Sequence, residues 1–203
     1  MQGGRGRKAP SAFSERAFAH AKGERRVKKI ILWLLFCAAL GVVVFAFLPR
    51  LFLTAENENG KVVLILPVHE GERYTVRFIH SVARTPVDEI YEIAPDCSIL
   101  RETVYDMMGA GLPYEPLEGQ TFTTENGKYR ISGFDMRIPA LTYRINMVVA
   151  DHTLLIGRDE YPLRRYASGP GKPLTFRVRR LAPYEAVLLW RGAREAKMKK
   201  GES

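Results

Sequence analysis

The side chains best suited to chemistry gather in residues 78–89, which read Phe-Ile-His-Ser-Val-Ala-Arg-Thr-Pro-Val-Asp-Glu. This segment supplies an imidazole, a hydroxyl and two carboxylates, at His80, Ser81, Asp88 and Glu89. A second imidazole, His152, comes later in the chain. Side chains of these types serve in acid–base catalysis, in nucleophilic attack and in metal binding. The segment leads from a strand-like stretch into a proline-marked loop, which is a common location for function.

A membrane-tethered hydrolase or metal-dependent enzyme built on these five residues is one hypothesis that the sequence leaves open. Neighbouring strand residues point to opposite faces, so Ser81 would have to pair with His152 rather than His80, with Asp88 or Glu89 as the orienting carboxylate. No Gly-x-Ser-x-Gly motif is present. The residue types suit zinc or a harder cation, but their spacing matches no ligand pattern. We therefore predict no catalytic residues, no metal site and no cofactor. The simplest expectation is that His80 hydrogen-bonds a loop carboxylate such as Glu89 and so fixes the loop.

A second feature is the segment 105–113, Tyr-Asp-Met-Met-Gly-Ala-Gly-Leu-Pro. Gly109 and Gly111, followed by Pro113, indicate a backbone path that side chains would block. Such a path can bring backbone N–H groups close to an anion, but a tight structural turn is the simpler interpretation. Together the two segments give a set of candidate binding residues. These are His80, Ser81, Thr85, Pro86, Asp88, Glu89, Tyr105, Gly109, Gly111, Pro113 and His152.

The elements that position these residues are short and strand-like. Ten such runs are Lys61–Leu66, Arg73–His80, Glu89–Ile93, Ile99–Tyr105, Gln120–Thr124, Lys128–Ser132, Tyr143–Ala150, Thr153–Ile156, Leu174–Val178 and Ala186–Trp190. Alternation puts Tyr74, Val76, Phe78 and His80 on one face of the second run. Asn126-Gly127 predicts a type I′ hairpin turn. The pattern predicts an all-β domain, a single sandwich or barrel over residues 55–190.

An apolar run at residues 30–48 precedes this domain and contains no charged residue. A helix of this length spans roughly 29 Å, close to the hydrocarbon thickness of a bilayer. The cationic residues 25, 26, 28 and 29 come before it and only Arg50 follows closely, which predicts a cytoplasmic N-terminus and an extracytoplasmic domain. Leu53-Thr54-Ala55 resembles a weak signal-peptidase site. The run is longer than a usual signal peptide core, however, so we predict a single-pass anchor in the cell membrane.

The net charge of +9 is concentrated at the two ends of the chain. Residues 1–29, a predicted flexible cytoplasmic tail, carry nine Lys/Arg and two Glu. Residues 190–203, which include the predicted charged C-terminal tail 191–203, carry five Lys/Arg and two Glu. The remainder is close to neutral, whereas a nucleic-acid-binding domain usually has its basic surface on the folded part. This distribution predicts no nucleic-acid partner and favours attraction of the N-terminal tail to anionic lipid.

The two polar segments resemble those of a bacterial family known as domain of unknown function 1850. Its members typically show Phe/Tyr-Ile-His-Ser-Val, then residues like Thr-Pro-Val-Glu-Glu, then Tyr/Phe-x-x-x-Gly-Ala-Gly-Leu-Pro. The matching segments here are Phe78–Val82, Thr85–Glu89 and Tyr105–Pro113, with Asp88 replacing the usual Glu. His152-Thr153-Leu154 and Pro170-Gly171 also resemble family features. The resemblance covers about residues 62–180.

Genes of this family often lie beside those for tripartite ATP-independent periplasmic (TRAP) transporters of the TAXI type. The resemblance therefore implies an extracytoplasmic accessory protein, anchored in membrane lipid, with a transporter membrane component or its substrate-binding protein as partner. It assigns no catalytic residues. A structural scaffold of the cell envelope is a further hypothesis, in which substitution of His80 or Glu89 would affect stability alone.

Overall fold

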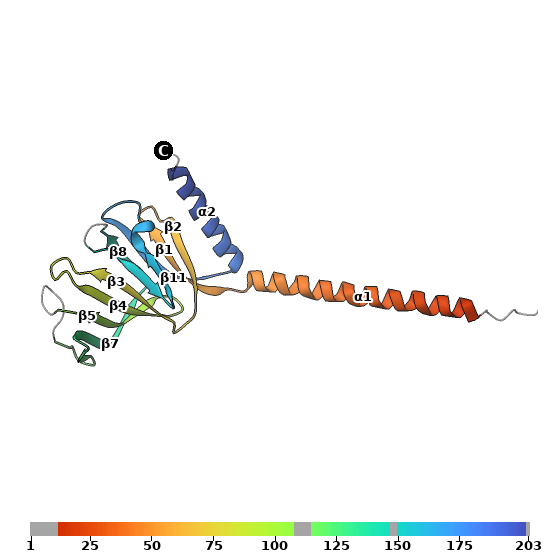
Figure 1. Cartoon of the computed structure of the whole chain (residues 1–203), viewed down its shortest axis with the longest axis horizontal. Helices are drawn as coiled ribbons and strands as arrows, with labels where there is room; N and C mark the ends of the chain where they lie inside the picture. Colours follow the sequence, from red (N-terminus) through yellow and green to blue (C-terminus); the bar gives the residue numbers. More distant parts are fainter. Residues whose placement is uncertain (1–11, 108–114, 147–149, 202–203) are drawn as a thin grey trace, which may run out of the picture. The chain divides into compact units, whose positions relative to one another are not determined.

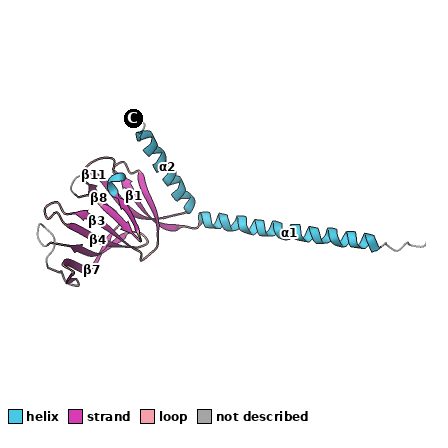
Figure 2. Cartoon of the chain, in the orientation of Figure 1, coloured by secondary structure: helices cyan, strands magenta, loops and turns pink. Residues whose placement is uncertain are grey.

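The computed structural model describes residues 12–107, 115–146 and 150–201, and it places side chains from residue 28 to residue 192 within these ranges. The chain separates into two units, Met1–Phe47 and Leu48–Ser203. The described strands of the second unit form two antiparallel sheets, one of four strands and one of seven (Figure 2). The predicted all-β class is therefore confirmed, and the architecture is a sandwich.

Helix α1 spans Ala12–Phe47. Its segment Lys28–Phe47 has a mean hydropathy of 2.9 and is long and apolar enough to cross a membrane, as a signal anchor or as a signal sequence. The helix begins well before the apolar run, so part of the predicted flexible tail is helical. Leucine, alanine and phenylalanine side chains without a polar face are typical of a helix that lies in lipid.

The four-stranded sheet has the order β2(Val62–Val68), β1(Arg50–Asn57), β11(Lys172–Leu181), β8(Leu141–Ile145). Strand β1 was not among the predicted strands, although Leu53 and Ala55 are almost fully buried on it. The weak cleavage motif ends at Ala55, which pairs with Leu64 on one side and Phe176 on the other. Cleavage there would remove most of a strand that lies between two others.

The seven-stranded sheet has the order β10(Asp159–Pro162), β9(Thr153–Ile156), β3(Arg73–Ile79), β4(Pro86–Ile93), β5(Ser98–Tyr105), β7(Lys128–Ile138), β6(Thr121–Glu125). Asn126 and Gly127 join β6 to β7 with φ of 52° and 75°. Two positive φ values between the paired residues Glu125 and Lys128 are those of the predicted type I′ turn.

The main hydrophobic core lies between the two sheets. It includes Leu53, Leu174 and Phe176 from the smaller sheet and Tyr74 and Leu154 from the larger one, all at most 1% exposed. A second cluster, Val87, Tyr105 and Ile131, continues the core within the larger sheet. The alternation of buried and exposed residues along β3 and β11 follows the period of two that a strand imposes.

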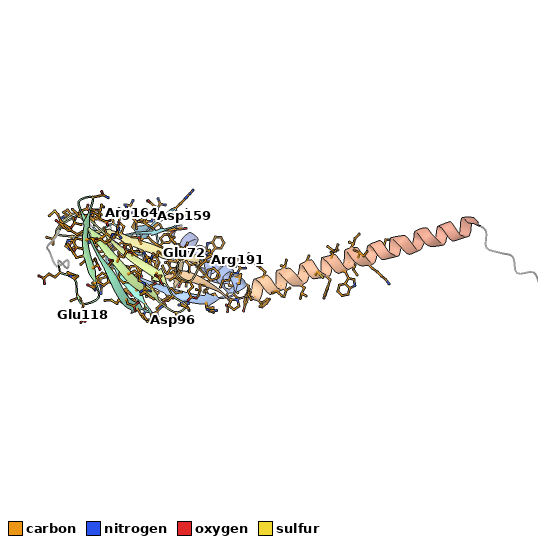
Figure 3. The ribbon with its side chains drawn as sticks, turned by 90° about the horizontal axis from the view of Figure 1, so that it is seen from below. Glu72, Asp96, Glu118, Asp159, Arg164 and Arg191 are labelled. Carbon is orange, nitrogen blue, oxygen red and sulfur yellow. The ribbon has the colours of Figure 1, made fainter. Side chains whose placement is uncertain are left out.

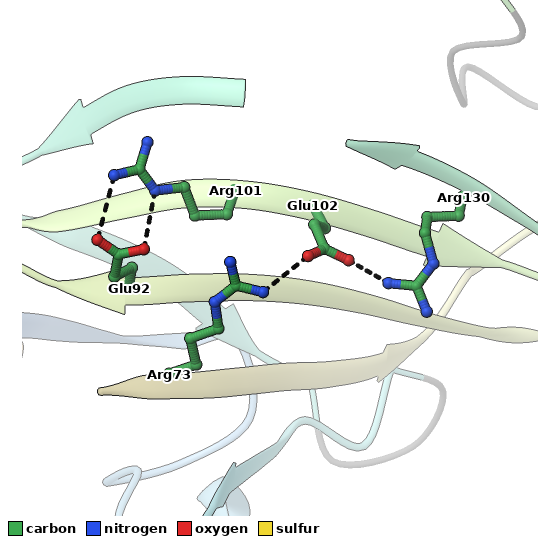
Figure 4. A network of polar contacts seen from close by, with 5 residues as sticks. All are labelled: Arg73, Glu92, Arg101, Glu102 and Arg130. Carbon is green, nitrogen blue, oxygen red and sulfur yellow. Dashed lines mark hydrogen bonds and ion pairs between the residues drawn. The ribbon is translucent and has the colours of Figure 1, made fainter. Parts of the chain in front are cut away.

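The outer face of the larger sheet is covered by ion pairs (Figure 4). Glu102 on β5 pairs with Arg73 at 2.8 Å and with Arg130, and Arg101 pairs with Glu92 at 3.1 Å. Charged side chains also project from the surface elsewhere, among them Asp96, Glu118, Asp159 and Arg164 (Figure 3). Solvent-exposed pairs of this kind contribute about 0–1 kcal/mol each, so this face is a solvated surface.

The predicted strand at Ala186–Trp190 is wrong, because these residues belong to helix α2(Pro183–Gly201). Pro183 occupies the first helical position. Its fixed φ suits a helix there, and a backbone N–H, which proline lacks, would have no intrahelical partner at that position. The Glu185 carboxylate accepts a hydrogen bond of 2.7 Å from the backbone N–H of Ala182, which closes the N-terminus. These start signals outweigh the short apolar run that resembled a strand.

Gly133 is expected to be intolerant of substitution. It lies where the pairing of β7 with β5 shifts register, with φ of +89°, and an added Cβ would come within 2.5 Å of the Gly119 carbonyl oxygen. We expect Gly133→Ala to lower the free energy of unfolding by about 2 kcal/mol or more, measured by urea unfolding of detergent-solubilised protein. Gly127→Ala is the control, since Gly127 has a positive φ but no atom within 4 Å of the added Cβ. Equal losses in the two variants would contradict a role for the Gly119 contact.

Candidate functional site

The carboxylate of Glu89 is directed between the two sheets. On β4 the alternate residues Val87, Tyr91 and Ile93 are 1–2% exposed, and Glu89 falls on the same face. Its Oε2 accepts a hydrogen bond of 2.9 Å from the Tyr91 hydroxyl on the same strand. It also accepts a hydrogen bond from the hydroxyl of Tyr143, which belongs to β8 of the opposite sheet. Glu89 thus connects the two layers of the sandwich.

The three oxygens form a closed triangle, because the hydroxyls of Tyr91 and Tyr143 also lie 2.7 Å apart. Each phenol has one hydroxyl proton, so two protons are shared among the three oxygen–oxygen contacts of the triangle. Burial, and then the negative charge of Glu89, raises the pKa of both tyrosines well above its ordinary value. Both hydroxyls therefore stay protonated and act as donors at physiological pH.

His152 lies beside Tyr143, one of the two tyrosines that bind Glu89. Its ring stacks on Phe78 with centroids 5.4 Å apart and lies 5.4 Å from the Tyr143 ring. The side chain is 6% exposed, and its Nδ1 has no hydrogen-bond partner among the described residues. Burial lowers the pKa of His152, against a weaker opposite effect of Asp151. We refer to Phe78, Glu89, Tyr91, Tyr143 and His152 as the interior polar cluster.

The His80 loop lies next to this cluster in the chain. The His80 Nδ1 accepts hydrogen bonds from the backbone N–H groups of Val82 and Ala83, at 3.3 and 3.2 Å. The backbone N–H of His80 donates a hydrogen bond of 2.9 Å to the Thr85 carbonyl oxygen, which closes the loop. His80 therefore fixes its loop, but the expected partner was wrong. Backbone amides take the place of Glu89, whose carboxylate is engaged by tyrosines between the sheets.

The other predicted residues of this segment point elsewhere. Asp88 forms a bidentate ion pair with the Arg77 guanidinium, and each nitrogen–oxygen distance is 2.7 Å. This pair lies on the opposite face of β4 from Glu89. Ser81 is exposed, Pro86 begins β4, and the Thr85 Oγ1 is buried with no hydrogen-bond partner among the described residues. Within the described ranges no three His, Cys, Asp or Glu side chains form a metal-binding group. Of the five residues of the enzyme hypothesis, Glu89 and His152 thus both contact Tyr143, whereas His80 and Asp88 have other partners.

Tyr105 is fully buried and packs with Val87 and Ile131, so it belongs to the core. Gly109, Gly111 and Pro113 lie outside the described residues. The prediction that these residues contribute to binding together with the His80 loop therefore stays a prediction.

Sequence analysis missed Phe78, Tyr91 and Tyr143 as members of the site. One signal was present: Glu89 and Tyr91 are two apart on a strand whose other odd-numbered residues are apolar. A carboxylate at such a position must face the core, and a buried carboxylate requires hydrogen-bond donors. The donor Tyr143 lies 54 residues from Glu89, and no local pattern indicates it.

The fold and the cluster define the protein as a β-sandwich domain, with a polar group joining its sheets, that follows an apolar helix. Residues 74–163 match the model of the family described as domain of unknown function (DUF1850). The chain therefore carries a DUF1850 domain, as the polar motifs indicated. The matched range contains the seven-stranded sheet almost entirely, together with β8 and the interior polar cluster. The strands β1, β2 and β11, which complete the sandwich, lie outside it. Comparison with curated proteins and with solved structures gave no match.

His152 is expected to make stability depend on pH. Because its pKa is lower in the folded protein than the ordinary 6.5, the unfolded chain binds the proton first as pH falls. The free energy of unfolding should therefore be unaffected by this group above about pH 7. It should decrease below about pH 6.5, by at most about 1.4 kcal/mol per pH unit, until the folded His152 is itself protonated.

The measurement is urea unfolding at a series of pH values for the wild type and for His152→Gln. The difference between the two should shrink as the solution is acidified. His69→Gln is the control, because the His69 side chain is 90% exposed. A wild-type advantage that is constant over this pH range would contradict the argument.

Proposed function

We propose that this protein is a single-pass, membrane-anchored accessory protein of a TRAP transporter of the TAXI type. Its β-sandwich would bind the transporter's membrane component or its substrate-binding protein on the extracytoplasmic side. The observation that carries the proposal is the direct connection between the two units. Only Leu48 and Pro49 separate α1 from β1, so an anchor in the bilayer would hold the DUF1850 domain at the membrane surface.

The orientation is supported by the charges that flank the apolar helix. Four Lys/Arg lie within residues 25–29, before the apolar run, and Arg50 alone follows it closely. Flanking Lys and Arg are retained on the cytoplasmic side. A cysteine placed at exposed Ser81 should react with a membrane-impermeant maleimide in intact cells, if the outer membrane, where one is present, is permeabilised. Native Cys37 lies within the apolar helix and native Cys97 is buried, so the unmodified protein is the control.

A partner surface is provided by the tip of the His80 loop. Val82 is 71% exposed, and the loop that carries it is closed by four hydrogen bonds between His80 and the loop backbone, two of them accepted by the His80 Nδ1. An apolar side chain on a rigid loop is a good anchor for a protein partner, because little conformational freedom is lost on binding. Tethering the domain to the membrane also raises its effective concentration near a membrane partner, which makes a modest intrinsic affinity sufficient.

The test is affinity purification of the tagged full-length protein from its native membranes after mild chemical crosslinking. We expect a TRAP membrane component or substrate-binding protein to be recovered, and expect Val82→Glu to reduce that recovery about tenfold or more. Met136→Glu is the matched control, because Met136 is also exposed, at 55%, but lies on β7. Recovery of no transporter component, under conditions in which the transporter's own subunits stay together, would refute the proposal.

A further inference from the structure

Large apolar side chains are exposed on the first half of helix α2. Val187 is 53% exposed, Leu188 61% and Trp190 49%, and all three lie within two turns. Beside them is a shallow groove of about 360 Å³ lined by Phe52, Ile65, Pro183, Ala186, Val187 and Trp190. Val187 and Trp190 line this groove, whereas Leu188 is not among its lining residues. Exposed apolar side chains gathered in this way often mark a surface that contacts a protein or a membrane.

The position of α2 in the fold indicates what covers it. The register of the central strands places Leu181, the last residue of β11, opposite Arg50, the first residue of β1. The chain reaches Arg50 directly from the apolar helix, and it enters α2 two residues after Leu181. Figure 1 shows the start of α2 beside the start of β1. The exposed apolar residues therefore lie at the end of the sandwich where β1 begins.

The charge of the following segment is complementary to anionic lipid. Residues 191–200 contain five Lys/Arg and one Glu, in the second half of the same helix. Tyr184 and Trp190 are the residue types that are enriched at membrane interfaces, where an amphipathic ring meets both lipid and water. Basic residues near an anionic lipid surface strengthen binding to it.

We propose that α2 is a second membrane contact. It lies in the headgroup region of an anionic bilayer, inserts Val187, Leu188 and Trp190 among the upper acyl chains, and places its basic second half against the lipid phosphates. Burial of apolar side chains and attraction to anionic lipid act together where a helix lies at a membrane surface. With α1 as a first attachment and α2 as a second, the sandwich is held against the bilayer instead of rotating freely above it.

The test uses the two tryptophans of the chain, Trp33 in the apolar helix and Trp190 in α2. In a full-length Trp33→Phe variant, Trp190 is the only fluorophore of its kind. The protein is reconstituted into phosphatidylcholine vesicles with or without phosphatidylglycerol, with part of the lipid brominated near the top of the acyl chains. We expect about twofold or stronger quenching of Trp190 in the anionic vesicles, because the indole lies at the depth of the bromines. Leu188→Glu in the same background should abolish the quenching, whereas Met136→Glu should leave it unchanged.

A Trp190→Phe variant, in which Trp33 reports insertion of α1, separates failure of the anchor from failure of this proposal. If Trp33 is quenched and Trp190 is not, in either lipid, the proposal is overturned. Quenching of Trp190 that persists in Leu188→Glu also overturns it. If Trp190 becomes protected only after a transporter component is added, α2 binds protein, and the lipid proposal is wrong.

Discussion

Replacing Glu89 by Ala is expected to lower the free energy of unfolding by about 3 kcal/mol. The carboxylate accepts from Tyr91, which is 2% exposed, and from Tyr143, which is half-buried. Removing it leaves at least one of the two hydroxyls without an acceptor, since the phenols can still hydrogen-bond each other, and such a loss costs about 1–3 kcal/mol. It also opens a cavity at the junction of the two sheets. Chemical denaturation of the detergent-solubilised protein measures the effect.

The control is Glu89→Gln, which keeps the shape and one acceptor oxygen and should be considerably less destabilising. Tyr143→Phe, which removes one donor, should cost about 1–2 kcal/mol. A double-mutant cycle between Glu89→Gln and Tyr143→Phe should then give a coupling energy of about 1 kcal/mol, since the two residues contact each other directly. Additive losses would mean that the contact between the sheets contributes nothing to stability.

The same variants separate the accessory role from a purely structural one. The interior polar cluster lies between the sheets, so Glu89→Gln should leave transporter recovery close to wild type at a temperature where it remains folded. Val82→Glu, on the exposed loop tip, should reduce recovery with little effect on stability. If both variants alter stability and neither alters recovery, the scaffold hypothesis is favoured.

Placing two arginines in the apolar helix is expected to release the protein from the membrane almost completely. Leu35→Arg with Ala39→Arg puts both charges near the middle of Lys28–Phe47, a segment without any charge beyond its first two residues. Each arginine at the centre of a spanning helix opposes insertion by about 2.5–3.5 kcal/mol. Together they oppose it by about 6 kcal/mol, which is enough to reverse insertion. Sedimentation after alkaline carbonate washing shows whether the protein remains with the membranes.

The matched control is Leu35→Phe with Ala39→Leu, which changes the same two positions and keeps them apolar. It should sediment like the wild type. The intact mass of the membrane-bound wild type completes the test, because a retained anchor gives the full 23.0 kDa chain. A shorter mature protein that begins near residue 56 would contradict the anchor and would lack most of β1.

Most of the larger sheet could be predicted from the sequence, because strand alternation and turn chemistry are local. The runs at Arg73–His80 and Ile99–Tyr105 agree with β3 and β5 to within a residue, and Asn126-Gly127 has the predicted turn geometry. Strand β1 was missed, because it follows the apolar helix with little punctuation. The last apolar run was assigned to a strand, because a short apolar stretch fits either period and helix start signals decide between them.

The sequence by itself determined the apolar helix, the β class and the two polar segments that identify the DUF1850 domain. Each of these depends on composition or on spacing over a few residues. Only the tertiary structure decided which of the polar residues act together. Packing of the two sheets brought Tyr143 to Glu89, and pairing of β3 with β4 brought Arg77 to Asp88 on the other face of β4. The physical reason is that strand alternation assigns a side chain to a face, while the fold alone determines what that face meets.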